Sequence, residues 1–233
     1  MGRRVLIIFV ILYSKLIYAD INHYHLSVGV GNRISSFKNH ISDDVAAMGP
    51  MLTSSFGYKF TDWEIMAHSQ IKIGVTENFN QQAEGSIIKG RSVYRGMGFG
   101  PMVKYHFNDI LFLKVPIIEK EVEIWPFYIK FGPTYQILTT NKWDKRNVSG
   151  GKHDPENIIK YQGGGFTLGL GMTNNPPDFK NQLFFELLYT YITYERLSVT
   201  LDAGRETKVV HKEKLSYDFY EKTIALVIGM VLF

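Results

Sequence analysis

Hydrophobic and polar residues alternate with a period of two along much of this chain, most clearly over residues 63–75. One face of that segment collects apolar and small side chains: Trp63, Ile65, Ala67, Ser69, Ile71, Ile73 and Val75. The other face collects mostly polar ones: Glu64, Met66, His68, Gln70, Lys72 and Gly74. A helix would spread both sets around its circumference, whereas a strand places them on opposite faces. The segment is therefore predicted to be a β-strand with one apolar face.

The same period predicts eight strands in all. Their approximate spans are 22–32, 50–60, 63–75, 96–107, 124–138, 162–172, 182–195 and 220–233. Most are nine to fourteen residues long, whereas strands of soluble proteins usually have about five or six residues. A tilted strand of about 9 to 11 residues spans the hydrocarbon core of a bilayer. A soluble β-sandwich or a lipocalin-like barrel is the alternative with the same period.

The connections between these segments alternate in length. Thr61 and Asp62 join two strands, and residues 173–181 form another short link, whereas about 17 to 24 polar residues separate the other pairs. Short turns on one side and long loops on the other are typical of an outer-membrane barrel with an even number of strands. We therefore predict an all-β, eight-stranded antiparallel up-and-down barrel with long extracellular loops. The connection 108–123 is long for a periplasmic turn, which leaves a count of ten strands open.

The first 19 residues have the parts of a secretory signal peptide. Arg3 and Arg4 precede an apolar run from Val5 to Tyr13, and the segment ends on Ala19. We expect cleavage after Ala19, so that residues 20–233 form the barrel domain. An uncleaved anchor is the alternative, although its apolar run is too short to span a bilayer.

The net charge of +4 does not indicate a nucleic-acid partner. The leader holds three of the 26 basic residues and none of the 22 acidic ones, so the remaining chain has a net charge of only +1. A basic binding face needs a larger excess than this.

The chain has no cysteine, which excludes disulfides, thiolate metal ligands and cysteine nucleophiles. Residues 163–165 are three glycines without the lysine and helix of a phosphate loop, so neither cofactor nor metal is expected.

The terminal strand carries a resemblance to a known family. The sequence ends in Phe233, with Val231, Val227 and Ala225 at alternate positions before it. With the strand pattern and the leader, this segment resembles the small bacterial outer-membrane barrels of the OmpA-transmembrane, OmpX and OmpW kind. The resemblance implies that Phe233 and Val231 belong to the signal read by the barrel-assembly machinery. It also implies a monomer in the outer membrane, in contact with lipid and lipopolysaccharide.

The faces opposite the lipid carry a polar network that we expect inside the barrel. Its predicted members are His25, Glu64, His68, Lys72, Lys104, His106, Lys130, Glu186 and Lys222. The interior of an eight-stranded barrel is just wide enough for side chains to fill it. Paired charges that plug the lumen and a narrow polar passage for small solutes are both consistent with this set. The function expected is non-enzymatic: a structural or surface-interaction role, or a narrow pore.

An enzymatic alternative depends on one short motif. His25 and Ser27 lie two residues apart on one strand face, loosely similar to the His-x-Ser motif of outer-membrane lipid A deacylases. A serine nucleophile needs a base within hydrogen-bond reach and a third group that orients the base. Both residues are predicted to face the lumen rather than the lipid, so a catalytic role is not the main prediction.

Overall fold

The computed structural model describes residues 24–39, 45–76, 81–83, 86–88, 92–107, 111–115, 120–124, 126–143, 156–173, 182–202 and 207–232. The predicted signal peptide and Phe233 lie outside these residues. No helix within the described ranges is long and apolar enough to cross a membrane.

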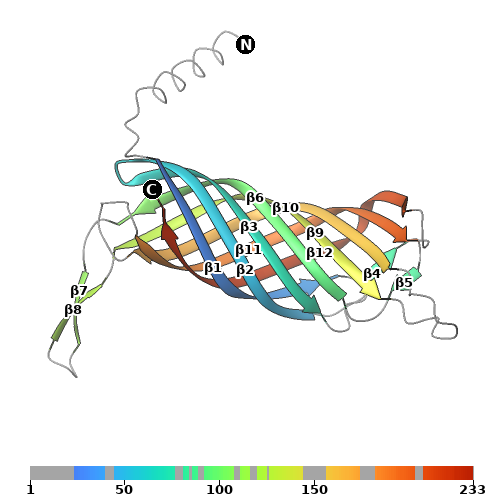
Figure 1. Ribbon diagram of the computed structural model, residues 1–233, viewed down its shortest axis with the longest axis horizontal. Coiled ribbons are helices and arrows are strands. Elements are labelled where there is room, and N and C mark those ends of the chain that lie inside the picture. The colour runs from blue at the N-terminus through green and yellow to red at the C-terminus, as the bar shows by residue number, and fades with distance from the viewer. Residues whose placement is uncertain are drawn as a thin grey trace, which may run out of the picture.

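Eight long antiparallel strands close into a barrel (Figure 1). They are β1 (Tyr24–Lys38), β2 (Val45–Phe60), β3 (Trp63–Thr76), β6 (Ser92–His106), β9 (Phe127–Trp143), β10 (Glu156–Thr173), β11 (Leu183–Asp202) and β12 (Thr207–Val231). Their order around the wall is β1-β12-β11-β10-β9-β6-β3-β2, so β12 pairs with β1 and closes the sheet. The predicted fold class and the strand count of eight are confirmed. We call the end at which Thr61 and Asp62 join β2 to β3 the turn end, and the opposite end the far end.

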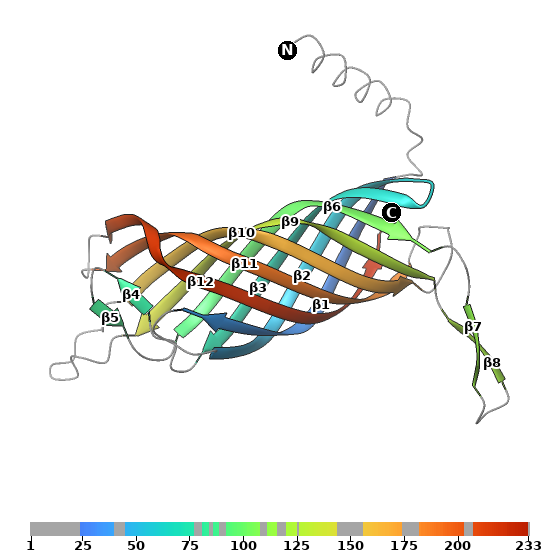
Figure 2. The same cartoon turned by 180° about the vertical axis from the view of Figure 1, so that it is seen from behind.

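Two short hairpins lie outside the barrel wall. The strands β4 (Gln81–Ala83) and β5 (Ser86–Ile88) pair only with each other, as do β7 (Leu111–Val115) and β8 (Lys120–Ile124). The two hairpins lie at opposite ends of the barrel in both views (Figures 1 and 2). The long 108–123 connection therefore contains the separate hairpin β7–β8 at the turn end. It adds no strands to the wall, which excludes the ten-stranded alternative.

The strands are longer than the sequence pattern indicated. β10, β11 and β12 contain 18, 20 and 25 residues, well above the 9 to 11 or so that a bilayer core requires. Consequently the far-end connections are shorter than the predicted 17 to 24 residues. The connection between β1 and β2 spans residues 39–44, and the one between β11 and β12 spans residues 203–206.

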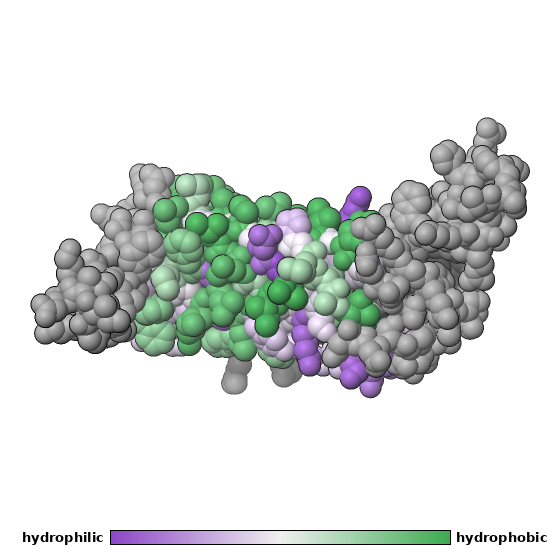
Figure 3. All heavy atoms as spheres, turned by 90° about the horizontal axis from the view of Figure 1, so that it is seen from below, coloured by the Kyte–Doolittle hydropathy of each residue, from purple (hydrophilic) through white to green (hydrophobic). Residues whose placement is uncertain are grey.

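The outer wall of the barrel is apolar. Large hydrophobic side chains stand exposed on every strand of the wall, for example Val30 at 58% and Leu226 at 64%. On the face seen in Figure 3, hydrophobic residues cover the barrel nearer to β7–β8, and most of the hydrophilic ones lie toward the other end. A soluble sandwich or lipocalin-like barrel buries its apolar face, so this outer wall excludes both. The wall is suited to contact with hydrocarbon.

The polarity of the two faces inverts toward the far end, as β11 shows. From Leu183 to Tyr191 the outward residues Leu183, Phe185 and Leu187 are apolar, and the inward face alternates the apolar Phe184 and Leu188 with the polar Glu186 and Thr190. Beyond Tyr191 the outward residues are Thr193, Glu195 and Arg196, and the inward ones are Ile192, Tyr194 and Leu197. The far-end segment thus has the pattern of a water-exposed sheet with an apolar interior.

The prediction that Lys222 faces the lumen implies that Leu226, Ile228 and Met230, which are in phase with it, face inward as well. Leu226, Ile228 and Met230 point outward, and Val227 and Val231 are buried in the lumen. Both sets are apolar, so a period of two does not distinguish the faces there. The predicted faces of this strand are thus shifted by one residue. The charged residue that points into the lumen is Glu221, and Lys222 points outward.

Candidate functional site: the barrel lumen

The first luminal charge cluster surrounds Glu64 at the turn end. His25 Nε2 lies 2.6 Å from Glu64 Oε1, and Lys104 Nζ lies 3.2 Å from Oε2. His106 Nε2 lies 3.0 Å from the same Oε2. Lys104 also lies over the ring of Tyr128, 4.2 Å from its centroid. One buried carboxylate therefore holds together side chains from β1, β3 and β6.

The second cluster joins β9 to β11. Lys130 Nζ donates to Glu186 Oε2 at 2.7 Å, and the Tyr128 hydroxyl donates to Glu186 Oε1 at 3.0 Å. Gly171 makes room for this tyrosine, because a Cβ at that position would lie 2.1 Å from Cζ of the Tyr128 ring. Any larger residue at Gly171 would displace Tyr128 from the carboxylate.

The third cluster surrounds Glu221, which is 1% exposed. Its carboxylate accepts hydrogen bonds from Lys72 Nζ at 2.9 Å, Ser35 Oγ at 3.0 Å, Thr223 Oγ1 at 2.7 Å and the Tyr194 hydroxyl at 2.6 Å. The Gln136 side-chain amide also donates to it. Lys72 comes from β3 and Glu221 from β12, so this pair crosses the lumen.

Arg33 is a further buried cation beside the third cluster. Its Nη1 donates to Ser35 Oγ at 2.6 Å, and its Nη2 donates to the Ile73 carbonyl at 3.0 Å. Its guanidinium lies 4.8 Å from the centroid of the Tyr94 ring. Arg33 is linked to Glu221 through the hydroxyl of Ser35.

Two polar residues lie between these clusters on β3. His68 Nδ1 lies 2.8 Å from Ser55 Oγ. Gln70 is 1% exposed, and neither atom of its amide has a hydrogen-bond partner among the described residues. A buried polar group without a partner costs free energy.

An apolar cluster fills the lumen beyond the charges, toward the far end. Its buried members are Phe37, Ala47, Tyr94, Leu138, Ile159, Tyr161, Ile192, Tyr194, Leu197 and Phe219. The Phe219 ring lies 4.7 Å from the rings of both Tyr161 and Tyr194, measured between centroids. Tyr194 belongs to this cluster and also donates to Glu221, so the aromatic and ionic parts of the filling are continuous.

One cavity in the lumen near the turn end is very small. This cavity, lined by Ser27, Lys104, Tyr128, Lys130 and Glu186, among others, has a volume of about 20 Å³. This volume holds about one water molecule. Ser27 therefore faces a space too small for an acyl chain, and the nearby His25 is engaged with Glu64.

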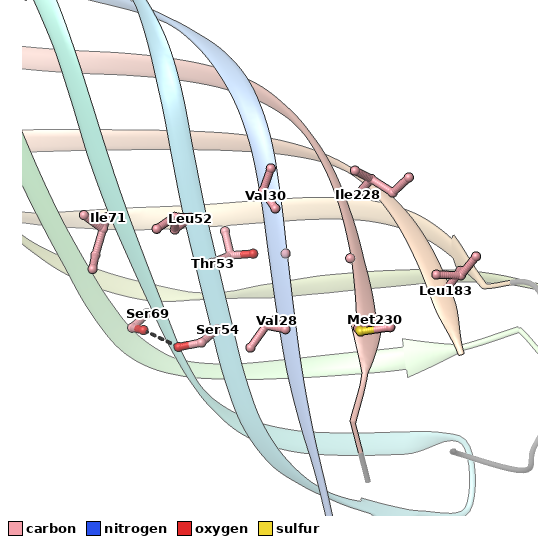
Figure 4. Close-up of a pocket in the computed structure, with 12 residues that line it drawn as sticks. Val28, Val30, Leu52, Thr53, Ser54, Ser69, Ile71, Leu183, Ile228 and Met230 are labelled. Carbon is pink, nitrogen blue, oxygen red and sulfur yellow. Dashed lines mark hydrogen bonds between the residues drawn. The ribbon is translucent and has the colours of Figure 1, made fainter. Parts of the chain in front are cut away.

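A larger concavity lies on the outer wall (Figure 4). It has a volume of about 610 Å³ and is lined by residues of β1, β2, β3, β11 and β12, among them Val28, Leu52 and Ile228. Ser54 and Ser69, which also line it, are hydrogen-bonded to each other at 2.8 Å. The lining of this concavity contains no acidic or basic residue. A second concavity, of about 760 Å³, is also lined by Ser54 and Ser69 and includes His68, whose Nδ1 is hydrogen-bonded to Ser55 Oγ.

Eight of the nine residues predicted for the luminal network point inward, and they form separate clusters. They are His25, Glu64, His68, Lys72, Lys104, His106, Lys130 and Glu186. The prediction for Lys222 is wrong, because this residue is exposed on the outer face, with its Nζ 5.3 Å from the centroid of the Tyr220 ring. The described residues contain no group of three or more His, Asp or Glu arranged for a metal ion.

Sequence reasoning missed Arg33, Tyr194 and Glu221. Each lies where the polarity of a strand changes, so the alternation that identified the other residues is interrupted there. The signal that could have placed Glu221 is its position two residues before Thr223, in phase with the inward Ala225 and Val227.

Comparison with protein-family models and with curated protein sequences finds no match. Solved structures of outer-membrane proteins are similar to the chain at low sequence identity. The Neisserial surface protein A matches with a TM-score of 0.45 and 10% identity, over 88% of this chain and 96% of that one. Ail, the attachment invasion locus protein of Yersinia pestis, matches with a TM-score of 0.42 and 13% identity, over 89% of this chain and 98% of that one. The outer membrane protease OmpT of Escherichia coli matches with a TM-score of 0.34 and 7% identity, over 90% of this chain and 95% of that one.

The closed eight-stranded sheet and its apolar outer wall are the architecture of an outer-membrane β-barrel. In hydrocarbon every backbone polar group needs a partner within the protein, and a closed barrel supplies one to each strand. The pairing of β1 with β12 over residues 27–38 and 220–231 closes the wall, so neither strand has a free edge over these residues.

Proposed function

We propose that the protein is a sealed, non-enzymatic outer-membrane barrel that displays its far end at the cell surface. The observation that carries the proposal is the filled lumen. Each described buried carboxylate is paired with a lysine, as Glu64 with Lys104, Glu186 with Lys130 and Glu221 with Lys72. Beyond them the apolar cluster occupies the far-end lumen. A lumen filled in this way favours the plug over a passage for solutes.

The inverted polarity of β11 and β12 supports a placement of the far end in water. Their far-end segments have polar outward residues, such as Glu195 and Asp218, and an apolar interior. Such a segment is stable in water and not in hydrocarbon. We propose that it extends beyond the bilayer on the extracellular side, with the Thr61–Asp62 turn in the periplasm. The segment and its connections would then form the surface available to other molecules.

Conductance in a planar bilayer tests the seal. We expect the purified wild-type protein to give no steady single-channel current. Replacement of both Tyr161 and Phe219 by alanine removes two rings from the apolar cluster, and we expect intermittent current from this variant. Stable wild-type channels whose ion selectivity changes with Lys72→Gln would place the current in the lumen and overturn the proposal.

Labelling of intact cells tests the orientation. The chain has no cysteine, so Asp218→Cys and Asp62→Cys each introduce a single thiol. An impermeant maleimide should label the first in intact cells and the second only after the outer membrane is permeabilised. The reverse result would show that the barrel is inserted the other way.

A further inference from the structure

The hairpin formed by β7 and β8 at the turn end is a sheet of only two strands. Each strand pairs with the other and with no further strand of the described chain, so both outer edges of the hairpin are unpaired among the described residues. A two-stranded hairpin is at most marginally stable in water, and three or more strands with an apolar face are needed for independent stability. The hairpin therefore needs a further strand, and its sequence indicates which one.

The cross-strand register gives the hairpin one mainly apolar face. Alternate positions of a strand share one face of the sheet. On one face every position except that of Lys120 holds an aliphatic residue: Leu111, Leu113, Val115, Val122 and Ile124. The positions of the opposite face hold Phe112, Lys114, Glu121 and Glu123. An added strand would enlarge an amphipathic sheet of this kind.

The two outer edges of the hairpin differ in charge. β7 contains one charged residue, Lys114, whereas β8 contains Lys120, Glu121 and Glu123. Charged residues on an edge strand oppose its pairing with another chain. The edge of β7 is therefore the one open to an added strand.

The β7 sequence is complementary to itself in the antiparallel direction. When Leu113 lies opposite Leu113 of a second copy, every position of the strand has a partner. Leu111 then lies opposite Val115 of the second copy, and Phe112 lies opposite Lys114. Aliphatic pairs and pairs of a cation with an aromatic ring are both favourable across strands. A second β7 strand thus fits this edge.

The β8 sequence is not complementary to itself. In the equivalent register, centred on Val122, Glu121 would lie opposite Glu123 of the second copy, and the symmetry would repeat this pair. Like charges directly opposite each other destabilise a strand pair. The charges of the hairpin therefore favour contact between two copies through β7 and oppose it through β8.

The symmetry of a β7–β7 contact is compatible with two barrels in one membrane. In both views the hairpin strands run across the long axis of the barrel and lie beyond the outline of its wall (Figures 1 and 2). Two copies inserted in the same direction are related by a two-fold axis along the membrane normal. A two-fold axis perpendicular to the sheet makes the joined strands antiparallel and keeps the two apolar faces on one side. The joined sheet would then lie parallel to the membrane.

We propose that two copies of the protein associate by antiparallel pairing of their β7 strands, which builds a four-stranded sheet of order β8-β7-β7-β8 at the turn end. The contact is isologous, so it closes at a dimer. The inference departs from the monomer that the family resemblance implies. It goes beyond the proposed function because it assigns a partner to a segment outside the barrel wall, and it depends neither on the sealed lumen nor on the orientation.

Oxidative cross-linking of single-cysteine variants in isolated outer membranes tests the register. Opposite Cα atoms of an antiparallel pair lie about 4.5 to 5.5 Å apart, within the range that a disulfide spans. Because the chain has no cysteine of its own, we expect Leu113→Cys to give a disulfide-linked dimer on oxidation. Val122→Cys is the matched control, since Val122 lies opposite Leu113 within the hairpin. Its equivalent in the dimer would be three strand spacings away, roughly 14 Å, so it should not cross-link.

Sedimentation equilibrium of the purified full-length protein in detergent tests the charge complementarity. We expect wild type to form dimers. Phe112→Lys would place a lysine opposite Lys114 of the second copy at both crossings, so the dissociation constant should rise about tenfold. Within its own hairpin the same lysine would lie opposite Glu123, which favours the hairpin, so weaker association would not reflect a lost hairpin. Phe112→Tyr keeps the aromatic ring and should associate as wild type does.

Several results would overturn the inference. Cross-linking of Val122→Cys as fast as that of Leu113→Cys, or of neither, would contradict the β7–β7 register. A wild-type protein that sediments as a monomer would contradict the dimer, and unchanged association of Phe112→Lys would place the contact elsewhere. Conductance and cell labelling do not measure association, so a failure of the sealed barrel or of its orientation is distinguishable from a failure of the dimer.

Discussion

Glu221→Gln is the most informative single substitution in this barrel. Side chains of Lys72, Ser35, Tyr194 and Thr223 all donate to its carboxylate, and so does Gln136. An amide at this position has one acceptor and an N–H₂ donor group, so some of these donors would face another donor. The Lys72 ammonium, which is fully buried, would lose its counter-charge.

The expected cost follows from the buried pair. Removal of one partner from a buried ion pair typically destabilises a protein by about 3 to 5 kcal/mol, because the other charge stays buried without compensation. We expect Glu221→Gln to reduce the free energy of unfolding by this amount. The unfolding equilibrium constant would then change by roughly two to four powers of ten.

Reversible unfolding in urea with lipid vesicles, followed by tryptophan fluorescence, measures this change. Glu195→Gln serves as the control, since Glu195 is exposed on β11 and surface substitutions usually stay within about 0.5 kcal/mol. A double variant, Lys72→Met with Glu221→Gln, removes both charges. It should be more stable than Glu221→Gln alone, because no unpaired ammonium is left in the lumen.

Two results would refute this reasoning. A loss below about 1 kcal/mol for Glu221→Gln would mean that Lys72 obtains its stabilisation elsewhere. A double variant whose loss equals the sum of the two single losses would mean that the charges are not coupled. Either result would remove the main support for the luminal plug.

Three further outcomes are expected from unfolding measurements in lipid. Ile71→Arg places a charge on the lipid-facing wall and should cost about 2 to 4 kcal/mol, whereas Ile71→Leu should be nearly neutral; similar losses for both would contradict the outward assignment. Gln70→Met should stabilise the barrel by about 1 kcal/mol because the Gln70 amide has no partner among the described residues, and a loss of stability would show that the amide is satisfied. Thr61 has a φ of 54°, so Thr61→Asn should stabilise the turn by about 0.5 to 1 kcal/mol, and unchanged stability would argue against strain there.

The sequence predicted the parts of this fold in which one face of a strand is clearly polar. Along β3, charged and polar residues from Glu64 to Lys72 alternate with apolar ones, and each side chain points as predicted. The membrane supplies hydrocarbon on one side and the lumen supplies paired charges on the other, so the two faces have opposite composition. Eight of the nine residues that this signal predicted for the luminal network point inward.

The prediction failed where both faces of a strand have similar composition. At the turn end of β12, Ala225, Val227 and Val231 face an apolar part of the lumen that includes Met51 and Phe184. With apolar residues on both faces, the face of Lys222 cannot be read from alternation. Only the pairing of β12 with β1 and β11 fixes it.

Strand lengths were underestimated for a related reason. A pattern with apolar residues outward and polar residues inward identifies only the part of each strand within the bilayer. On β11 that pattern ends near Tyr191, yet the strand continues to Asp202 with the opposite polarity. The predicted strands therefore leave Leu197 and Phe219 in a loop, and the role of these residues in filling the far-end lumen could not be foreseen.

The pair between Lys72 and Glu221 sets an order of events for assembly in the membrane. The two residues are 149 positions apart in the sequence and lie on β3 and β12, which come together only when the last strand reaches β1. Until then Lys72 has no carboxylate of β12 beside it and is better solvated by water than by hydrocarbon. Contacts between such distant segments form slowly because the intervening chain must first be ordered. Closure of the seam and burial of this lysine are thus expected to occur as one late, cooperative step, and a chain stalled before it would leave its central charges accessible to water.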